Sequence, residues 1–126
     1  MKYGDVLEKI LGHKKKLIEE NKIKSPINVL DKSIENNSAP DFLSIFDSSN
    51  VALIAEIKRS SASAGEINKN LDLEEFALDY ITSGASAISI LTEKTKFSGS
   101  ISDLKKISAI GKKTNTPILQ KDFIVD

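Results

Sequence analysis

Apolar side chains in the first 22 residues recur at the spacing of a helix. They stand three or four positions apart, with Lys and Glu residues between them, at Val6, Leu7, Ile10, Leu11, Leu17 and Ile18. This pattern predicts an amphipathic helix over residues 2–22. Residues 23–38 are polar and predict a linker, after which Pro40 is placed to occupy the first position of a short helix that reaches Phe46.

The pattern changes to short apolar runs after residue 50. The run Val51–Ala55 is typical of a strand that is buried on both faces of a parallel sheet. Two further strands are predicted at Ala87–Leu91 and Ile118–Lys121. A loop rich in Ser, Ala and Gly follows the first run, at residues 60–65.

Two helices are predicted between these strands. Asp72 is placed to cap the first helix, which should stop at Gly84. Ser100 is placed to cap the second, with Asp103 as its partner in the first turn, and Gly111 is expected to end it.

The order strand, helix, strand, helix, strand predicts parallel pairing through right-handed crossovers. Two folds fit this order: an open doubly wound sheet and part of a (β/α)₈ barrel. We divide the chain into a helical extension, residues 1–50, and an α/β region, residues 51–126.

Composition limits the classes of function. The 126 residues carry 18 basic and 18 acidic side chains, so no net charge is available to attract nucleic acid or an acidic membrane. The chain has no cysteine, which excludes cysteine-based metal sites. Its single histidine, His13, stands among lysines and is expected to be an exposed helix residue. Residues 1–20 lack the apolar core of a signal peptide, and no apolar run approaches the ~20 residues of a membrane span. We therefore expect a cytoplasmic protein.

Charged residues stand where the predicted strands end. Glu56 and Lys58 are two positions apart and should share a face, and Lys121 closes the third strand. In parallel α/β folds the active site lies at the carboxyl ends of the strands. With Phe97 and Phe123 nearby, this set predicts a small acid–base pocket with flat apolar walls. The alternatives are charges that reach solvent and phenylalanines that pack in the core.

Several segments resemble the indole-3-glycerol phosphate synthase family. The family motifs read roughly IAE-x-K-x-x-SPS, then GA-x-AIS-[IV]-LT-[ED] followed by F-x-GS, and then P-[IV]-L-x-KDFI-[IV]-D. They are matched in this order by Ile54–Ser63, Gly84–Glu93, Phe97–Ser100 and Pro117–Asp126. The APDF segment at Ala39–Phe42 also resembles the family. The resemblance covers essentially the whole chain.

This resemblance implies a (β/α)₈ TIM barrel enzyme of tryptophan biosynthesis, a carboxy-lyase. Its substrate is the small phosphorylated molecule 1-(2-carboxyphenylamino)-1-deoxyribulose 5-phosphate, whose indole ring closes with loss of CO₂ and water. No metal and no cofactor are implied. The resemblance gives Lys121 the role of general acid, has Lys58 bind substrate and assist proton transfer, and has Glu56 support it.

The same resemblance implies three substrate-binding residues. Phe97 and Phe123 would pack on the anthranilate ring, and Ser61 would lie in the loop over the site. Ala62 stands where the family usually has proline, so this loop is expected to be more mobile.

Length leaves rival interpretations open. A full barrel needs about 250 residues, and this chain supplies the helical extension with strands 1–3 and helices 1–2. It could therefore be an inactive N-terminal fragment, or a half-barrel that associates with itself or a complementing chain through unpaired strand edges. Another phosphate-binding barrel, similar to tryptophan synthase alpha, is disfavoured by the Lys-Asp-Phe motif at residues 121–123.

Overall fold

A computed structural model describes residues 3–29, 39–47 and 49–126 of the chain. The chain divides into two compact units, one of residues 1–38 with Phe123–Asp126 and one of Ala39–Asp122. The division at residue 50 remains a prediction. Within the described ranges, no helix combines the length and the apolar composition needed to cross a membrane.

The first unit contains one long helix, α1 (Tyr3–Lys24). It confirms the helix predicted over residues 2–22 and continues two residues further. Ile10 is its buried apolar residue, and Lys22 near its end forms ion pairs with Glu19 and Asp126. Of the predicted linker, residues 30–38 lie outside the described residues.

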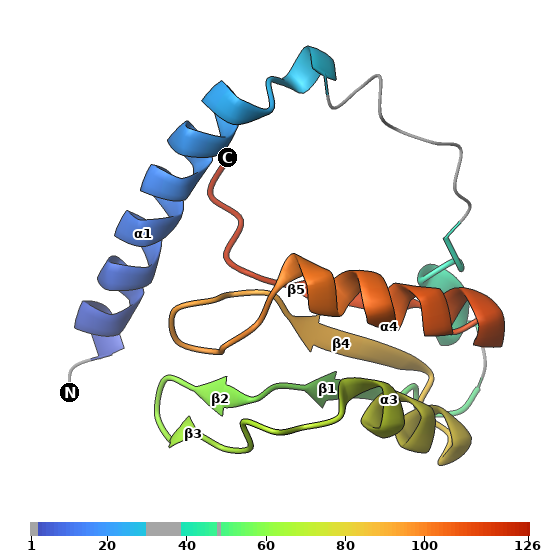
Figure 1. Cartoon of the computed structure of the whole chain (residues 1–126). Helices are drawn as coiled ribbons and strands as arrows, with labels where there is room; N and C mark the ends of the chain where they lie inside the picture. Colours follow the sequence, from blue (N-terminus) through green and yellow to red (C-terminus); the bar gives the residue numbers. More distant parts are fainter. Residues whose placement is uncertain (1–2, 30–38, 48) are drawn as a thin grey trace. The chain divides into compact units, whose positions relative to one another are not determined.

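The second unit is built on a parallel three-stranded sheet (Figure 1). Its strands are β1 (Ile54–Ile57), β4 (Ala87–Leu91) and β5 (Ile118–Lys121), in the order β1-β4-β5. Helices α3 (Leu73–Thr82) and α4 (Ile101–Thr114) make the two connections. The predicted alternation of parallel strands and helices is confirmed.

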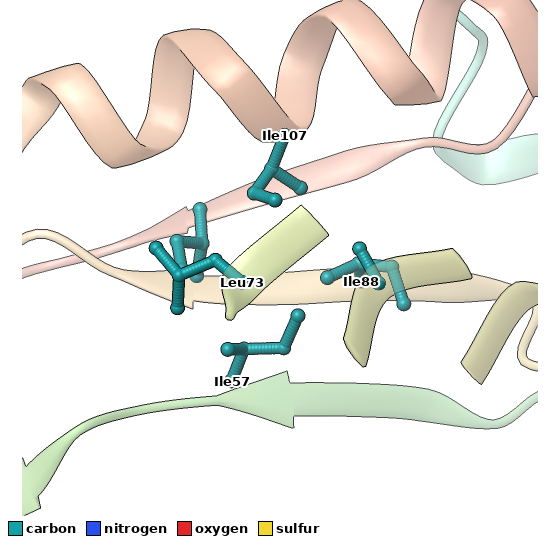
Figure 2. Packing of buried hydrophobic residues seen from close by; sticks show 6 residues of the cluster. Ile57, Leu73, Ile88 and Ile107 are labelled. Atoms are coloured by element: carbon teal, nitrogen blue, oxygen red, sulfur yellow. The ribbon is translucent and has the colours of Figure 1, made fainter. Parts of the chain in front are cut away.

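One face of this sheet carries the hydrophobic core. Ile57 and Ile88 point from neighbouring strands toward Leu73 of α3 and Ile107 of α4 (Figure 2). All four side chains are at most 5% exposed. Both helices therefore cover the same face of the sheet.

The opposite face of the sheet carries the predicted site. Side chains alternate along a strand, so Glu56 faces away from its neighbour Ile57. The register places Glu56 beside Ser89 of β4, and Ser89 beside Leu119 of β5. Lys121 is paired with Leu91, two residues further along both strands. Glu56 and Lys121 consequently share the face that α3 and α4 leave uncovered.

Helix caps set the ends of both crossover helices. The Asp72 carboxylate accepts hydrogen bonds from the N–H groups of Glu74 and Glu75, and the Ser100 hydroxyl accepts one from the Asp103 N–H. Both predicted caps are confirmed. Gly84 follows α3 with φ of 97°, a left-handed conformation that favours glycine.

The prediction that Gly111 ends the second helix is wrong. Helix α4 continues to Thr114, and Asn115 takes the left-handed position after it with φ of 53°. A Cβ atom on Gly111 would lie 2.6 Å from Cγ1 of Ile118 and 2.6 Å from the carbonyl oxygen of Thr116. Glycine at this position therefore allows β5 to pack closely on the helix.

Two further boundaries differ from prediction. Val51 is 96% exposed and β1, an edge strand of the described sheet, begins only at Ile54. The burial on both faces that was predicted for this run is therefore wrong. Among the three strands of the sheet, only β4 is buried along its whole length. The predicted short helix is the 3₁₀ turn η1 (Leu43–Phe46), which does not begin at Pro40. The Asp41 carboxylate precedes it and accepts a hydrogen bond from the Leu43 N–H.

Candidate functional site

Three charged side chains meet on the uncovered face, at the carboxyl ends of the strands. Lys58 Nζ lies 2.5 Å from Glu56 Oε1, and Lys121 Nζ lies 3.9 Å from Glu56 Oε2. Lys58 directly follows β1, and Lys121 is the last residue of β5. The predicted convergence of Glu56, Lys58 and Lys121 is therefore observed, across 65 positions of sequence between Glu56 and Lys121.

The geometry of this cluster suits proton transfer to a bound ligand. Each carboxylate oxygen of Glu56 faces a different lysine, so one anion orients two cations. An ammonium group carries three N–H donors, and one contact to Glu56 leaves donors for a ligand. The side chains of Glu56, Lys58 and Lys121 are 30%, 38% and 52% exposed, which leaves the cluster accessible.

Ser89 adds a neutral polar group to the same face. It is 4% exposed and lies between Glu56 and Leu119 in the sheet register. Among the described residues, no hydrogen-bond partner is found for its hydroxyl oxygen. Sequence reasoning did not single out Ser89, although its place two residues before Leu91 puts it on the face of Lys121.

The loop predicted after β1, at residues 60–65, forms a small hairpin. Strands β2 (Ser60–Ser61) and β3 (Gly65–Glu66) pair in antiparallel fashion. The Ser61 hydroxyl accepts a hydrogen bond of 3.0 Å from the Ala64 N–H inside the hairpin turn. The predicted role of Ser61 in substrate binding remains a prediction.

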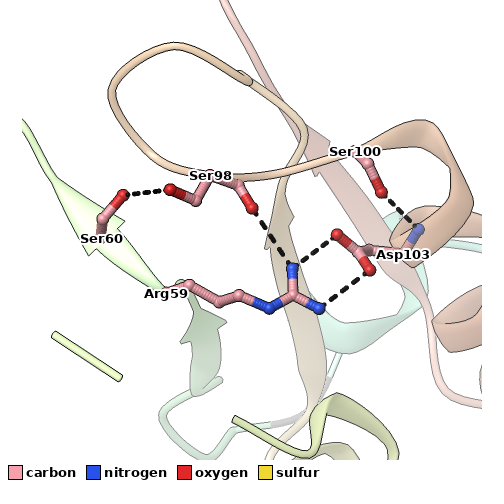
Figure 3. A network of polar contacts seen from close by, with 5 residues as sticks. All are labelled: Arg59, Ser60, Ser98, Ser100 and Asp103. Carbon is pink, nitrogen blue, oxygen red and sulfur yellow. Dashed lines mark hydrogen bonds and ion pairs between the residues drawn. The ribbon is translucent and has the colours of Figure 1, made fainter. Parts of the chain in front are cut away.

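An arginine network ties the end of β1 to α4 (Figure 3). The Arg59 guanidinium donates two hydrogen bonds to the Asp103 carboxylate, of 2.7 and 3.0 Å, and a third of 3.3 Å to the Ser98 carbonyl. These hydrogen bonds from Arg59 lower the pKa of Asp103 below its ordinary value, with burial opposing the shift. The network fixes the base of the hairpin.

Ser60 connects the hairpin to the loop after β4. Its hydroxyl donates to the Lys96 carbonyl at 2.9 Å and lies 3.0 Å from the Ser98 hydroxyl. Sequence reasoning missed both Ser60 and the Arg59–Asp103 pair. No local sequence pattern predicts these contacts, because the residues that make them are 36 to 44 positions apart.

The loop after β4 is organised by Glu93, which was not predicted as a site residue. The Glu93 carboxylate accepts hydrogen bonds from Thr95, Lys96 and Phe97. Phe97 is half-buried in this loop, and Phe123 belongs to the other compact unit. The contact of Phe97 and Phe123 with the anthranilate ring of the substrate remains a prediction. Within the described ranges, no three His, Asp or Glu side chains gather as a metal-binding group.

Comparison with known proteins identifies the family. The family model described as indole-3-glycerol phosphate synthase matches residues 7–126. Proteins named indole-3-glycerol phosphate synthase from Thermoanaerobacter pseudethanolicus, Campylobacter fetus and Roseiflexus sp. are 36%, 39% and 38% identical to the chain. Each alignment covers 96% of the chain and 45%, 46% and 47% of the relative, respectively. The chain therefore spans about half the length of these curated relatives.

The fold agrees with this match. The family has the TIM-barrel fold, and the parallel sheet of three strands with two helices on one face is a partial barrel. In such a barrel the helices form the outer ring, so the face that carries Glu56 and Lys121 is the inner face. The chain belongs to the indole-3-glycerol phosphate synthase family.

Proposed function

We propose that this chain carries part of the active site of an indole-3-glycerol phosphate synthase. The reaction converts 1-(2-carboxyphenylamino)-1-deoxyribulose 5-phosphate to indole-3-glycerol phosphate with loss of CO₂ and water, as a carboxy-lyase step of tryptophan biosynthesis in the cytoplasm. The observation that carries the proposal is the convergence of Glu56, Lys58 and Lys121 on the inner face of the sheet.

Lys121 is the proposed general acid. Ring closure needs a proton on the ribulose carbonyl oxygen as the aromatic carbon attacks, and the later loss of water needs a proton on the same oxygen as it leaves. An ammonium group that lies 3.9 Å from Glu56 is a suitable donor for the first step and, once Lys58 has helped to return a proton to it, for the second step. The same cation would stabilise the developing oxyanion.

Lys58 and Glu56 are proposed to prepare the substrate and the acid. Lys58 would bind an anionic group of the substrate and assist proton transfer, and Glu56 would hold both lysines in position. Two aromatic side chains, Phe97 and Phe123, would offer flat faces to the anthranilate ring. Ser61, in the hairpin after β1, would contribute a polar contact above the site.

The chain by itself is proposed to have no turnover. In the described part of the chain, β1 and β5 are edges of a sheet with three strands, and an unpaired edge is a template for another strand. Association with a second copy or with a complementing chain would cover these edges. Light scattering on the purified 126-residue chain distinguishes a monomer from such an assembly.

A chimera tests the proposed function. Residues 1–126 replace the matching part of the Thermoanaerobacter pseudethanolicus relative, and formation of indole-3-glycerol phosphate is followed by its indole fluorescence. We expect turnover in the chimera, and a loss of about 10²–10⁴ in kcat for Lys121→Ala. Lys105→Ala, which removes an exposed lysine of α4, serves as the matched control and should leave kcat unchanged.

The outcomes of this assay are decisive. A chimera that is folded by circular dichroism but forms no product contradicts the proposed function. Full activity after Lys121→Ala contradicts the role of Lys121 as the acid while leaving the family assignment intact. Turnover by the 126-residue chain alone contradicts the proposal that this chain needs further strands.

A further inference from the structure

Glu93 is a buried carboxylate whose charge is met by hydrogen bonds. It follows the end of β4 by two residues and is 1% exposed. Oε1 accepts from the Thr95 N–H at 2.8 Å and from the Thr95 hydroxyl at 2.6 Å, and Oε2 accepts from the N–H groups of Lys96 at 2.7 Å and Phe97 at 3.3 Å. All four groups donate to Glu93, an arrangement that suits an ionised carboxylate, which can only accept hydrogen bonds.

Glu93 is an anion in this environment. Burial by itself raises the pKa of the Glu93 carboxyl, but the hydrogen bonds from Thr95, Lys96 and Phe97 outweigh burial and lower the pKa below its ordinary value. A buried charge is tolerated when its lone pairs are satisfied in this way. The side chain is therefore a fixed charged centre around which the backbone of residues 95–97 is folded.

The loop that Glu93 organises is also closed at its base. The Gly99 N–H donates to the Glu93 carbonyl at 2.9 Å. A Cβ atom on Gly99 would lie 2.1 Å from the Leu91 carbonyl oxygen, so the chain returns in direct contact with the end of β4. Residues 93–99 thus form a compact loop with its ends together and a carboxylate at its centre.

This loop carries two features that reach beyond it. The Lys96 carbonyl accepts the hydroxyl of Ser60 at 2.9 Å, which links the loop to the hairpin after β1. Phe97 is one of the two aromatic residues that the proposed function places against the anthranilate ring. The backbone N–H groups of both residues donate to the same oxygen of Glu93, Oε2.

We propose that Glu93 is a positioning residue of the substrate site, which sets the place of the Phe97 ring by holding the backbone N–H groups of residues 95–97. The part of this inference that concerns ligand binding rests on the proposed function. The part that concerns the shape of the loop rests on the hydrogen bonds alone.

Glu93→Gln is the informative substitution because it preserves size. The amide of glutamine has one oxygen and one NH₂ group. With its NH₂ group at the place of Oε2, glutamine faces the N–H groups of Lys96 and Phe97, from which it cannot accept. With its NH₂ group at the place of Oε1, it faces the Thr95 N–H, while the Thr95 hydroxyl can turn and accept from it. The substitution therefore removes the charge and at least one backbone hydrogen bond that holds the loop, without opening a cavity.

Amide hydrogen exchange on the 126-residue chain tests the shape of the loop. We expect Glu93→Gln to accelerate exchange at least about tenfold at one or more of the N–H groups of Thr95, Lys96 and Phe97, while the amides of Ile88 and Ile90 in β4 keep their protection. Glu74→Gln makes the same chemical change at an exposed position of α3 and should alter neither group. Equal exchange at residues 95, 96 and 97 in the wild type and Glu93→Gln overturns the inference.

A second variant covers the case in which Glu93→Gln does not fold. Thr95→Val removes the hydroxyl donor to Glu93 Oε1 and leaves the carboxylate and the three backbone donors in place. We expect a smaller acceleration, confined to residues 95–97. Unchanged exchange at these amides in Thr95→Val, when Glu93→Gln fails to fold, counts against the inference.

Titration with anthranilate, followed by its own fluorescence, tests the link to Phe97. We expect Glu93→Gln and Phe97→Ala each to weaken binding severalfold, and the double variant to be no weaker than Phe97→Ala. Losses that multiply in the double variant show that Glu93 does not act through Phe97 and overturn the inference. If the wild-type chain does not bind anthranilate, the proposed ring contact fails, and hydrogen exchange still decides whether Glu93 shapes the loop.

Discussion

The Arg59–Asp103 pair offers a prediction whose size follows from the structure. Two hydrogen bonds of 2.7 and 3.0 Å join side chains that are 23% and 10% exposed. A hydrogen bond to a charged group contributes about 1.5–3 kcal/mol, and Asp103→Asn keeps one acceptor of similar shape while removing the charge. We therefore expect the unit Ala39–Asp122 to lose about 2 kcal/mol of unfolding free energy, the contribution of one of the two bonds.

Hydrogen exchange at the β4 amides measures this loss, because these amides exchange when the unit unfolds. A double-mutant cycle with Arg59→Gln isolates the pair from other effects. Glu19→Gln, which disturbs the exposed ion pair with Lys22 on α1, is the control and should leave β4 exchange unchanged. A coupling between residues 59 and 103 below about 0.5 kcal/mol would refute the assigned contribution.

The pH dependence of the same pair follows from the direction of the shift. Arg59 lowers the pKa of Asp103 in the folded chain, so the folded state binds this proton less readily than the unfolded state. The stabilisation is complete above the ordinary Asp pKa of about 3.9 and is lost as pH falls through the lower folded value. Wild type and Asp103→Asn should differ at pH 7 and converge in acid. A constant difference down to the acid limit of folding would contradict this explanation.

Three further substitutions are measured by the same exchange assay. Gly111→Ala should destabilise the unit Ala39–Asp122 by about 1–3 kcal/mol, since a Cβ atom would lie 2.6 Å from Ile118. If the variant is instead more stable, as expected from helix propensity alone, close packing does not require glycine at this position. Ser89→Ala should be neutral or stabilising by up to about 1 kcal/mol, because its buried hydroxyl lacks a partner among the described residues; a clear loss would reveal one. Asp72→Ala should cost about 1 kcal/mol by removing the α3 cap; no change would contradict capping.

Features that depend on neighbouring residues were predictable from the sequence. The caps at Asp72 and Ser100 act on N–H groups two or three residues away. The strands β4 and β5 follow from short segments, mostly apolar in β4 and beginning with Ile118 and Leu119 in β5. The convergence of Glu56, Lys58 and Lys121 was also predictable, because side chains alternate along strands and the carboxyl ends of parallel strands meet at one edge.

Features that depend on distant residues were not predictable. Gly111 looks like a helix stop until Ile118 is seen against it. Arg59 and Asp103 are 44 positions apart, and neither belongs to a pattern that predicts pairing. Glu93 is an intermediate case, since an acidic residue two positions after a mostly apolar strand is a signal, but its partners become apparent only when the loop closes.

We propose that Glu56 and Lys121 act as one unit in catalysis. This is tested by measuring kcat of the chimera with Glu56→Gln, with Lys121→Ala and with both substitutions. Groups that act together are not additive, so we predict that the double variant is no more than about threefold slower than the slower single variant. If the two single losses multiply in the double variant, the residues act independently and the central claim is contradicted.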